Sequence, residues 1–150
     1  MKRLHFTTVI HASRQAVWDA MLAPETYRIW TAEFTEGSYY EGSWETGARI
    51  RFLAPGGDGM TSVIEESRPH EFLSIKHLGV IKDGVEDTES EEVRKWAPGF
   101  ENYSFSEAGS STELAVDSDT TPDFEAYLVE TWPRALARLK ALCESPTAAK

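Results

Sequence analysis

Cysteine is nearly absent from this sequence, since Cys143 is the single one among 150 residues. One thiol excludes an internal disulfide and a zinc site built from several cysteines. The chain also lacks a long apolar run. Lys2 and Arg3 lead into LHFTTVI, which alternates apolar and polar residues instead of forming the apolar core of a secretory signal or a membrane span. We therefore expect a reducing, cytoplasmic setting with no membrane contact.

Basic residues are scarce relative to acidic ones. Fifteen Lys plus Arg stand against 25 Asp plus Glu, and the formal net charge is −10. Nucleic-acid binding that is independent of sequence requires basic side chains that neutralise phosphates, so this balance argues against it. The same balance argues against docking on anionic lipid. The densest acidic stretch, 83–92, has no Lys or Arg, and we interpret it as a solvated loop or as a surface for a protein partner.

What the sequence does contain is a regular succession of short alternating segments. Residues 4–10 alternate apolar and polar side chains, as a half-buried strand does. Further strands are predicted at 47–54, 60–66, 72–81, 103–105 and 112–116. Their even spacing, with turn signals such as GGDG between them, predicts one antiparallel meander.

Two helical regions flank this β-rich middle. The stretch HASRQAVWDAMLAPETYRIW, 11–30, holds two short helical patterns separated by Pro24, and Ser13 is a suitable N-cap for the first. Residues 121–144 form one long amphipathic pattern. Its apolar stripe is predicted to contain Phe124, Leu128, Trp132, Leu136, Leu139 and Cys143.

A long connection at 81–99 separates two of the predicted strands. Thr88-Glu89-Ser90-Glu91 fits a capping box with Thr88 as the N-cap, so a short helix is predicted inside this connection. Its charge density and Gly84 favour a mobile segment, and we expect it to act as a flap over a cavity entrance.

The order of these segments resembles a known superfamily. The stretch at 11–30, GARIRF at 47–52, EESRPHEFLSI at 65–75 and the ETW…ALARLKAL tail are similar to the START-like, Bet v 1-like (SRPBCC) superfamily. Within it, the resemblance is to the branch named for the activator of a heat-shock chaperone's ATPase. The acidic segment is longer than in the simplest version of the pattern.

The resemblance implies an α+β helix-grip fold. In this fold a curved antiparallel β-sheet follows two short helices after strand one, and a long C-terminal helix lies across the concave face. We expect one such domain at 1–144 and a polar tail at 145–150. The superfamily shares a fold and often a hydrophobic cavity, but not one reaction.

Inward-facing residues are the candidates for a cavity wall under the long helix. If Ser74 and Lys76 point outward, His77 points into an apolar space. It is then either a buried histidine held by its neighbours or a titratable group of a site. The full set of expected cavity residues is Phe6, Trp30, Phe52, Ile75, His77, Tyr103, Phe105, Leu128, Trp132 and Leu136. Most of the aromatic members of such a set are plain core in an average protein.

Three functions remain open from the sequence. The leading one is a non-enzymatic protein that binds a small hydrophobic or amphipathic ligand. An enzyme of the cyclase or aromatase type, which the superfamily contains, would use His77 with Tyr103 or Glu101 for acid–base chemistry. A chaperone-regulating module, as the branch name suggests, ranks last. No catalytic residue is assigned beyond the candidate His77, and no cofactor or metal is expected, because the histidines show no close ligand spacing.

Overall fold

The computed structural model describes residues 1–144. The polar tail expected at 145–150 lies outside these residues, and the domain boundary expected at residue 144 stays a prediction. In the described chain eight strands form one antiparallel sheet. The strands are β1 (Lys2–Ile10), β2 (Tyr39–Gly42), β3 (Arg49–Leu53), β4 (Gly59–Arg68), β5 (Phe72–Lys82), β6 (Val85–Asp87), β7 (Gly99–Ala108) and β8 (Ser111–Thr120).

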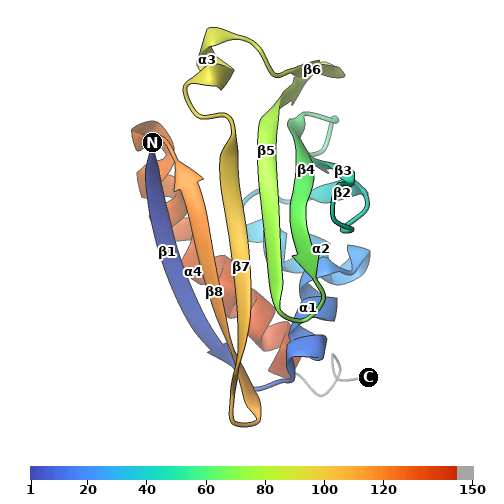
Figure 1. Ribbon diagram of the computed structural model, residues 1–150, viewed down its shortest axis with the longest axis vertical. Coiled ribbons are helices and arrows are strands. Elements are labelled where there is room, and N and C mark those ends of the chain that lie inside the picture. Colours follow the sequence, from blue (N-terminus) through green and yellow to red (C-terminus); the bar gives the residue numbers. More distant parts are fainter. Residues whose placement is uncertain (145–150) are drawn as a thin grey trace.

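The sheet order is β1-β8-β7-β5-β4-β3-β2, and β6 pairs with the end of β5 beyond β7 (Figure 1). Register shifts occur between β4 and β5 at Thr61/Ser62 and again at Ile64/Glu66. Such irregularities bend a strand and increase its twist, so they account for the curvature of the sheet at this point. Gly79 faces the backbone of Asp87 so closely that a Cβ atom would clash, which lets β6 approach β5.

The helices are α1 (Arg14–Leu22), α2 (Pro24–Trp30), the 3-10 turn η1 (Thr31–Glu33), α3 (Glu91–Arg94) and α4 (Pro122–Glu144). Helices α1, α2 and α4 lie on one face of the sheet, whereas α3 lies beyond its end, in the connection from β6 to β7 (Figure 1). As predicted, Ser13 caps α1, its side chain accepting a hydrogen bond from the Ala16 amide, and Pro24 opens α2. The curved sheet, the two short helices after β1 and the long C-terminal helix confirm the predicted α+β helix-grip fold.

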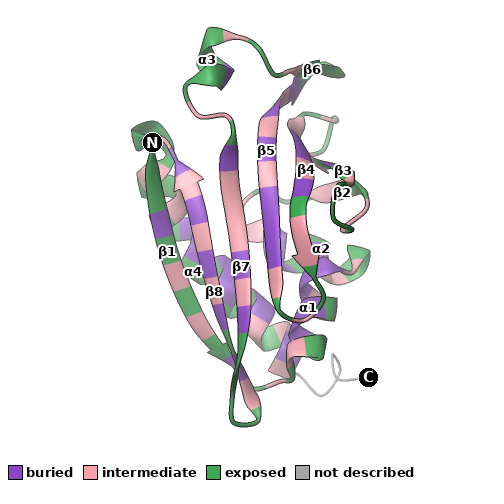
Figure 2. Ribbon diagram, in the orientation of Figure 1, coloured by how far each residue is buried: buried purple, intermediate pink, exposed green. Residues whose placement is uncertain are grey.

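The two short helices hold one end of the sheet against α4. Val17, Trp18 and Met21 of α1 are buried in the core, and the Tyr40 hydroxyl of β2 donates to the Leu22 carbonyl at 2.5 Å. Buried positions recur along β5 and β8, whereas β1 and α3 are mostly exposed or half-buried (Figure 2). The short helices therefore act as a brace between the sheet edge and the long helix.

Four details differ from the sequence-based predictions. Strands β2 and β6 were not predicted, because both are too short to show a clear alternation. The β7–β8 hairpin extends well beyond 103–105 and 112–116, since its polar ends are paired backbone as well. The N-cap of α3 is Ser90 rather than Thr88, because the Ser90 side chain accepts from the Val93 amide. Phe124 is 61% exposed and does not join the buried stripe of α4, because it lies in the first turn, at an open end of the sheet.

Candidate functional site

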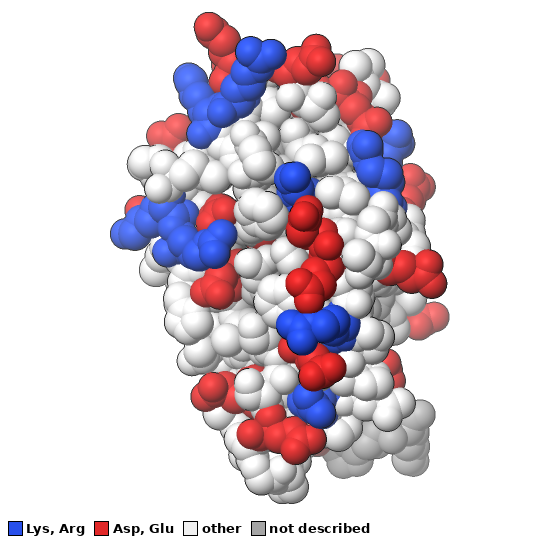
Figure 3. Space-filling view, in the orientation of Figure 1, with Lys and Arg blue, Asp and Glu red and all other residues white. Residues whose placement is uncertain are grey.

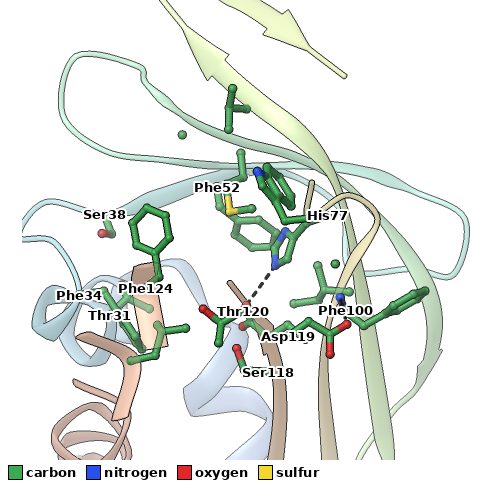
Figure 4. Close-up of a pocket in the computed structure, with 18 of the residues that line it drawn as sticks. Thr31, Phe34, Ser38, Phe52, His77, Phe100, Ser118, Asp119, Thr120 and Phe124 are labelled. Carbon is green, nitrogen blue, oxygen red and sulfur yellow. Dashed lines mark hydrogen bonds and ion pairs between the residues drawn. The ribbon is translucent and has the colours of Figure 1, made fainter. Parts of the chain in front are cut away.

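A cavity of about 660 Å³ lies between the sheet and the first half of α4. Its wall is formed by the inner face of the sheet, by α2 and η1, and by the α3 segment. In Figure 4, Phe34 and Phe124 stand on one side of the space, and Phe52 with His77 stands on the other. Because Phe124 is largely exposed, the cavity opens to solvent beside the start of α4. The volume falls in the range typical of sites for drug-sized ligands.

The wall is mainly aromatic and apolar. Its aromatic members come from all parts of the fold and are Tyr27, Trp30, Phe34, Trp44, Phe52, Trp96, Phe100, Tyr103, Phe124, Tyr127 and Trp132. Several of them contact one another edge to face, for example Tyr27 with Trp30 at a centroid distance of 5.8 Å and Phe34 with Trp132 at 4.9 Å. Such contacts are favourable in their own right, so the rings support one another around the open space.

A chain of four hydrogen-bonded side chains crosses the sheet at the cavity wall. The Ser62 hydroxyl lies 2.7 Å from Nδ1 of His77, and Nε2 of His77 lies 3.1 Å from Oε1 of Glu101. The Tyr103 hydroxyl donates to Oε2 of Glu101. A carboxylate only accepts hydrogen bonds, so Nε2 of His77 is the donor toward Glu101. Each of the four side chains therefore has a partner within the chain of residues itself.

Burial controls the acidity of the tyrosines at this wall. Burial, together with the nearby Glu101 carboxylate, raises the pKa of Tyr103 well above its ordinary value. Burial likewise raises the pKa of Tyr27 far beyond the physiological range. Both hydroxyls thus remain protonated at neutral pH and can serve only as neutral hydrogen-bonding groups.

Two indole groups of the wall lack a partner. The Nε1 atoms of Trp44 and Trp132 are buried and have no hydrogen bond among the described residues. By contrast, Nε1 of Trp30 donates to the Met21 carbonyl at 3.0 Å. Buried N–H groups without a partner are rare because their desolvation is not compensated. Both atoms are enclosed by protein atoms and have almost no accessible surface, so they do not face the cavity.

The cavity mouth carries an ion pair. Arg3 of β1 binds Asp119 of β8 at 2.8 Å, and the same carboxylate accepts the Phe100 amide at 2.9 Å. Burial of Asp119 acts to raise its pKa, but the hydrogen bonds from Arg3 and Phe100 outweigh it, and the net pKa lies below its ordinary value. Asp119 is therefore a fixed negative charge at neutral pH.

Seven of the ten expected cavity residues line the space. They are Trp30, Phe52, Ile75, His77, Tyr103, Leu128 and Trp132. The other three lie outside it, each for a separate reason of packing. Phe6 stacks on Trp132 at 6.1 Å, Phe105 packs against Trp18 at 5.3 Å, and Leu136 is buried further along α4. Whether the seven contact a ligand stays a prediction.

Sequence reasoning missed a part of the wall that comes from irregular segments. Phe34 and Trp44 lie in or near connections around β2, and Trp96 follows α3. Period-two or helical spacing cannot mark such positions. Only their residue type could have indicated them, since an aromatic side chain in a connection is usually covered by other residues.

Metal and thiol chemistry find little support in the described residues. Residues 1–144 contain no group of three or more His, Cys, Asp or Glu side chains arranged to hold a metal ion. Cys143 is buried near the end of α4, and burial raises the pKa of its thiol to about 11. A thiol with that pKa is protonated at neutral pH, so it is a weak nucleophile.

No helix within residues 1–144 combines the length and apolar character needed to cross a bilayer. The solved structures with a similar fold cover almost the entire chain. The Aha1 dimer from Colwellia psychrerythraea matches with a TM-score of 0.73 and 18% identity, over 96% of this chain and 97% of that one. CalU16 from Micromonospora echinospora matches with a TM-score of 0.63 and 21% identity, over 98% of this chain and 79% of that one.

A third neighbour is longer than this chain. DynU16, from the dynemicin biosynthetic locus, matches with a TM-score of 0.70 and 18% identity over 97% of this chain, which spans only 48% of DynU16. At such identities the likeness shows the fold alone. No curated protein matches the chain.

The family comparison is more specific than the fold. The family described as "Activator of Hsp90 ATPase homolog 1-like protein" matches residues 11–144, which include both short helices, most of the sheet and the whole of α4. The chain therefore belongs to the family of activator of Hsp90 ATPase homolog 1-like proteins, within the START-like, Bet v 1-like superfamily.

Proposed function

We propose that this protein binds a small hydrophobic or amphipathic ligand in the cavity under α4, without catalysing a reaction on it. The observation that carries the proposal is the cavity itself, about 660 Å³ with a mainly aromatic and apolar wall. Water gains little from contact with such a wall, so displacing it into bulk solvent favours binding of an apolar molecule. A few polar groups at the wall would orient the ligand.

The hydrogen-bonding pattern also favours binding over catalysis. An acid–base catalyst must exchange a proton with the substrate. His77 uses both ring nitrogens within the chain of side chains, toward Ser62 and Glu101, and the Tyr103 hydroxyl is used as well. A structural role for these residues, which fix β4, β5 and β7 together, is consistent with this arrangement.

Filling the cavity provides a direct test. Leu128 lines the cavity, whereas its neighbour Val129 is 49% exposed and does not. We expect Leu128→Trp to abolish or strongly weaken binding of uncharged aromatic compounds, because the larger ring occupies the space. The control Val129→Trp should bind like the wild type. Binding is followed by NMR shift changes or by quenching of tryptophan fluorescence. The proposal fails if no compound binds, or if both variants bind equally well.

The chain Ser62–His77–Glu101–Tyr103 also supports a second candidate, an acid–base enzyme of the cyclase or aromatase type. The variant His77→Gln separates the two. In a binding protein it should retain most of the affinity, since glutamine keeps a polar group of similar reach. In an enzyme the rate should fall by about 100- to 10,000-fold. Loss of turnover with unchanged ligand affinity would favour the enzyme.

The family name supplies the remaining candidate, regulation of a chaperone's ATPase, and the acidic segment 83–92 would be a partner surface for it. Glu86 of this segment is already paired with Arg49 and Arg51, each at 3.4 Å. Figure 3 shows basic and acidic atoms side by side at the end of the molecule that holds α3 and β6. Measuring chaperone ATPase rates with and without this protein would test the candidate.

The expected cytoplasmic setting also belongs with these proposals. It is supported by the single, buried, protonated Cys143. Cell fractionation of the tagged full chain tests it, and recovery of the protein in a secreted fraction would contradict it.

A further inference from the structure

The charged side chains that line the cavity are all of one sign. Among the described residues of the wall the carboxylates are Asp58, Asp87, Glu92, Glu101 and Asp119, and no lysine or arginine lines the space. The nearest paired base is Arg3, which binds Asp119 from outside the wall. The basic residues of α3 and its end, Arg94 and Lys95, are exposed and do not line the cavity.

This distribution determines which ligand charge the cavity can hold. An anionic group moved from water into the cavity would lose its hydration and gain no Lys or Arg partner from the wall. It would also approach Asp87 and Asp119, whose hydrogen bonds hold their pKa values below the ordinary one. An uncharged group neither loses the hydration of an ion nor is repelled by the carboxylates. A cationic group would be attracted both by the carboxylates and by the faces of the aromatic rings.

We propose that the cavity selects uncharged or cationic aromatic ligands and discriminates against anionic ones. The inference rests on the proposed binding function and specifies its ligand class. It excludes fatty-acid-like anions, which a purely apolar cavity of this size would otherwise accept.

The charge rule is tested with two fluorescent probes on the wild-type protein. N-phenylnaphthylamine is uncharged, and anilinonaphthalene sulfonate has the same rings with an added anionic group. We expect the dissociation constant of the sulfonate to be at least about tenfold higher, which corresponds to about 1.4 kcal/mol of binding free energy. Equal affinities, or tighter sulfonate binding, would overturn the charge rule and leave the binding function standing. Absence of binding by both probes would overturn the binding function as well.

A matched pair of variants assigns the discrimination to the wall. Glu91 and Glu92 are adjacent exposed residues of α3, and only Glu92 lines the cavity. We expect Glu92→Lys to strengthen sulfonate binding by about three- to tenfold and to leave N-phenylnaphthylamine unchanged. Glu91→Lys should have a smaller effect, because a charge pointing into solvent is screened. An equal effect of both variants would show that net charge, rather than the wall, governs selectivity.

Discussion

The two halves of α4 lie on very different surroundings. Toward its C-terminal end the helix buries Ala135, Leu139 and Cys143 against β1 and α1, and the first two have no exposed surface. Toward its N-terminal end Phe124 and Tyr127 are 61% and 45% exposed and line the cavity instead. The C-terminal half of α4 thus packs in the core, and its N-terminal half lines the cavity.

The difference follows from what faces each half. The short helix α1 packs against α4 and places Val17 and Trp18 in the core, whereas Met21 lines the cavity. Beside the N-terminal half, α2, η1 and the α3 segment line the cavity and leave a gap. A well-packed end can hold the fold while the other end retains an empty, shaped space, which is how proteins combine stability with a binding site.

Truncating a leucine in each half should give the largest contrast. Leu139 has no exposed surface, and Leu139→Ala should lower the free energy of unfolding by about 4 kcal/mol, because a new cavity forms in a rigid core. Leu128→Ala on the cavity wall should lower it by only about 1 kcal/mol, since part of the side chain already faces empty space. Urea unfolding measures both. Equal losses would remove the distinction between the two ends.

Trp132 lies at the boundary between them. It contacts Phe6, Trp30, Phe34 and Tyr103, but it also lines the cavity. Trp132→Ala should therefore cost about 3 kcal/mol, the lower end of the range for a buried tryptophan. The same unfolding experiment gives the value. A loss below about 1 kcal/mol would mean that α4 faces the sheet differently.

The segment 81–99 should be the most mobile internal part of the hollow end. Only Val93 anchors α3 by burial, and β6 pairs with a single neighbour. We expect its amides to exchange with deuterium about 100-fold faster than those of β5 at 72–77, corresponding to about 2.7 kcal/mol in opening free energy. Hydrogen-exchange mass spectrometry measures this. Equal protection of the two segments would exclude a flap.

The ion pair at the mouth should contribute least. Because the pKa of Asp119 is lowered in the folded state, its contribution is present above the unfolded value and is lost as the pH falls through the folded one. We expect Asp119→Asn to destabilise the protein by about 1 kcal/mol or less at neutral pH, because Arg3 is half exposed. The difference should begin to shrink as the pH falls below the ordinary value of 3.8 and should vanish below the lowered pKa of the folded state. A pH-independent difference would assign the effect to packing.

The sequence by itself determined the helix-grip fold, because its evidence is local and repeats along the chain. Alternation marked most strands, Ser13 and Pro24 marked the starts of the two short helices, and three- and four-residue spacing marked α4. It also placed His77 on the inner face, since period-two alternation from Leu73 determines the side of the sheet. Short strands such as β2 carry too few residues for alternation to be recognised.

The tertiary structure alone decided where packing ends and the cavity begins. Leu136 and Leu128 belong to the same predicted stripe, yet the first is buried core and the second lines the cavity, because different elements face them. The pairing of His77 with Glu101, and the lack of a partner at Trp132, likewise depend on strands and loops distant in sequence. Periodicity assigns a residue to a face, but what fills the space opposite that face is set only when the whole chain has folded.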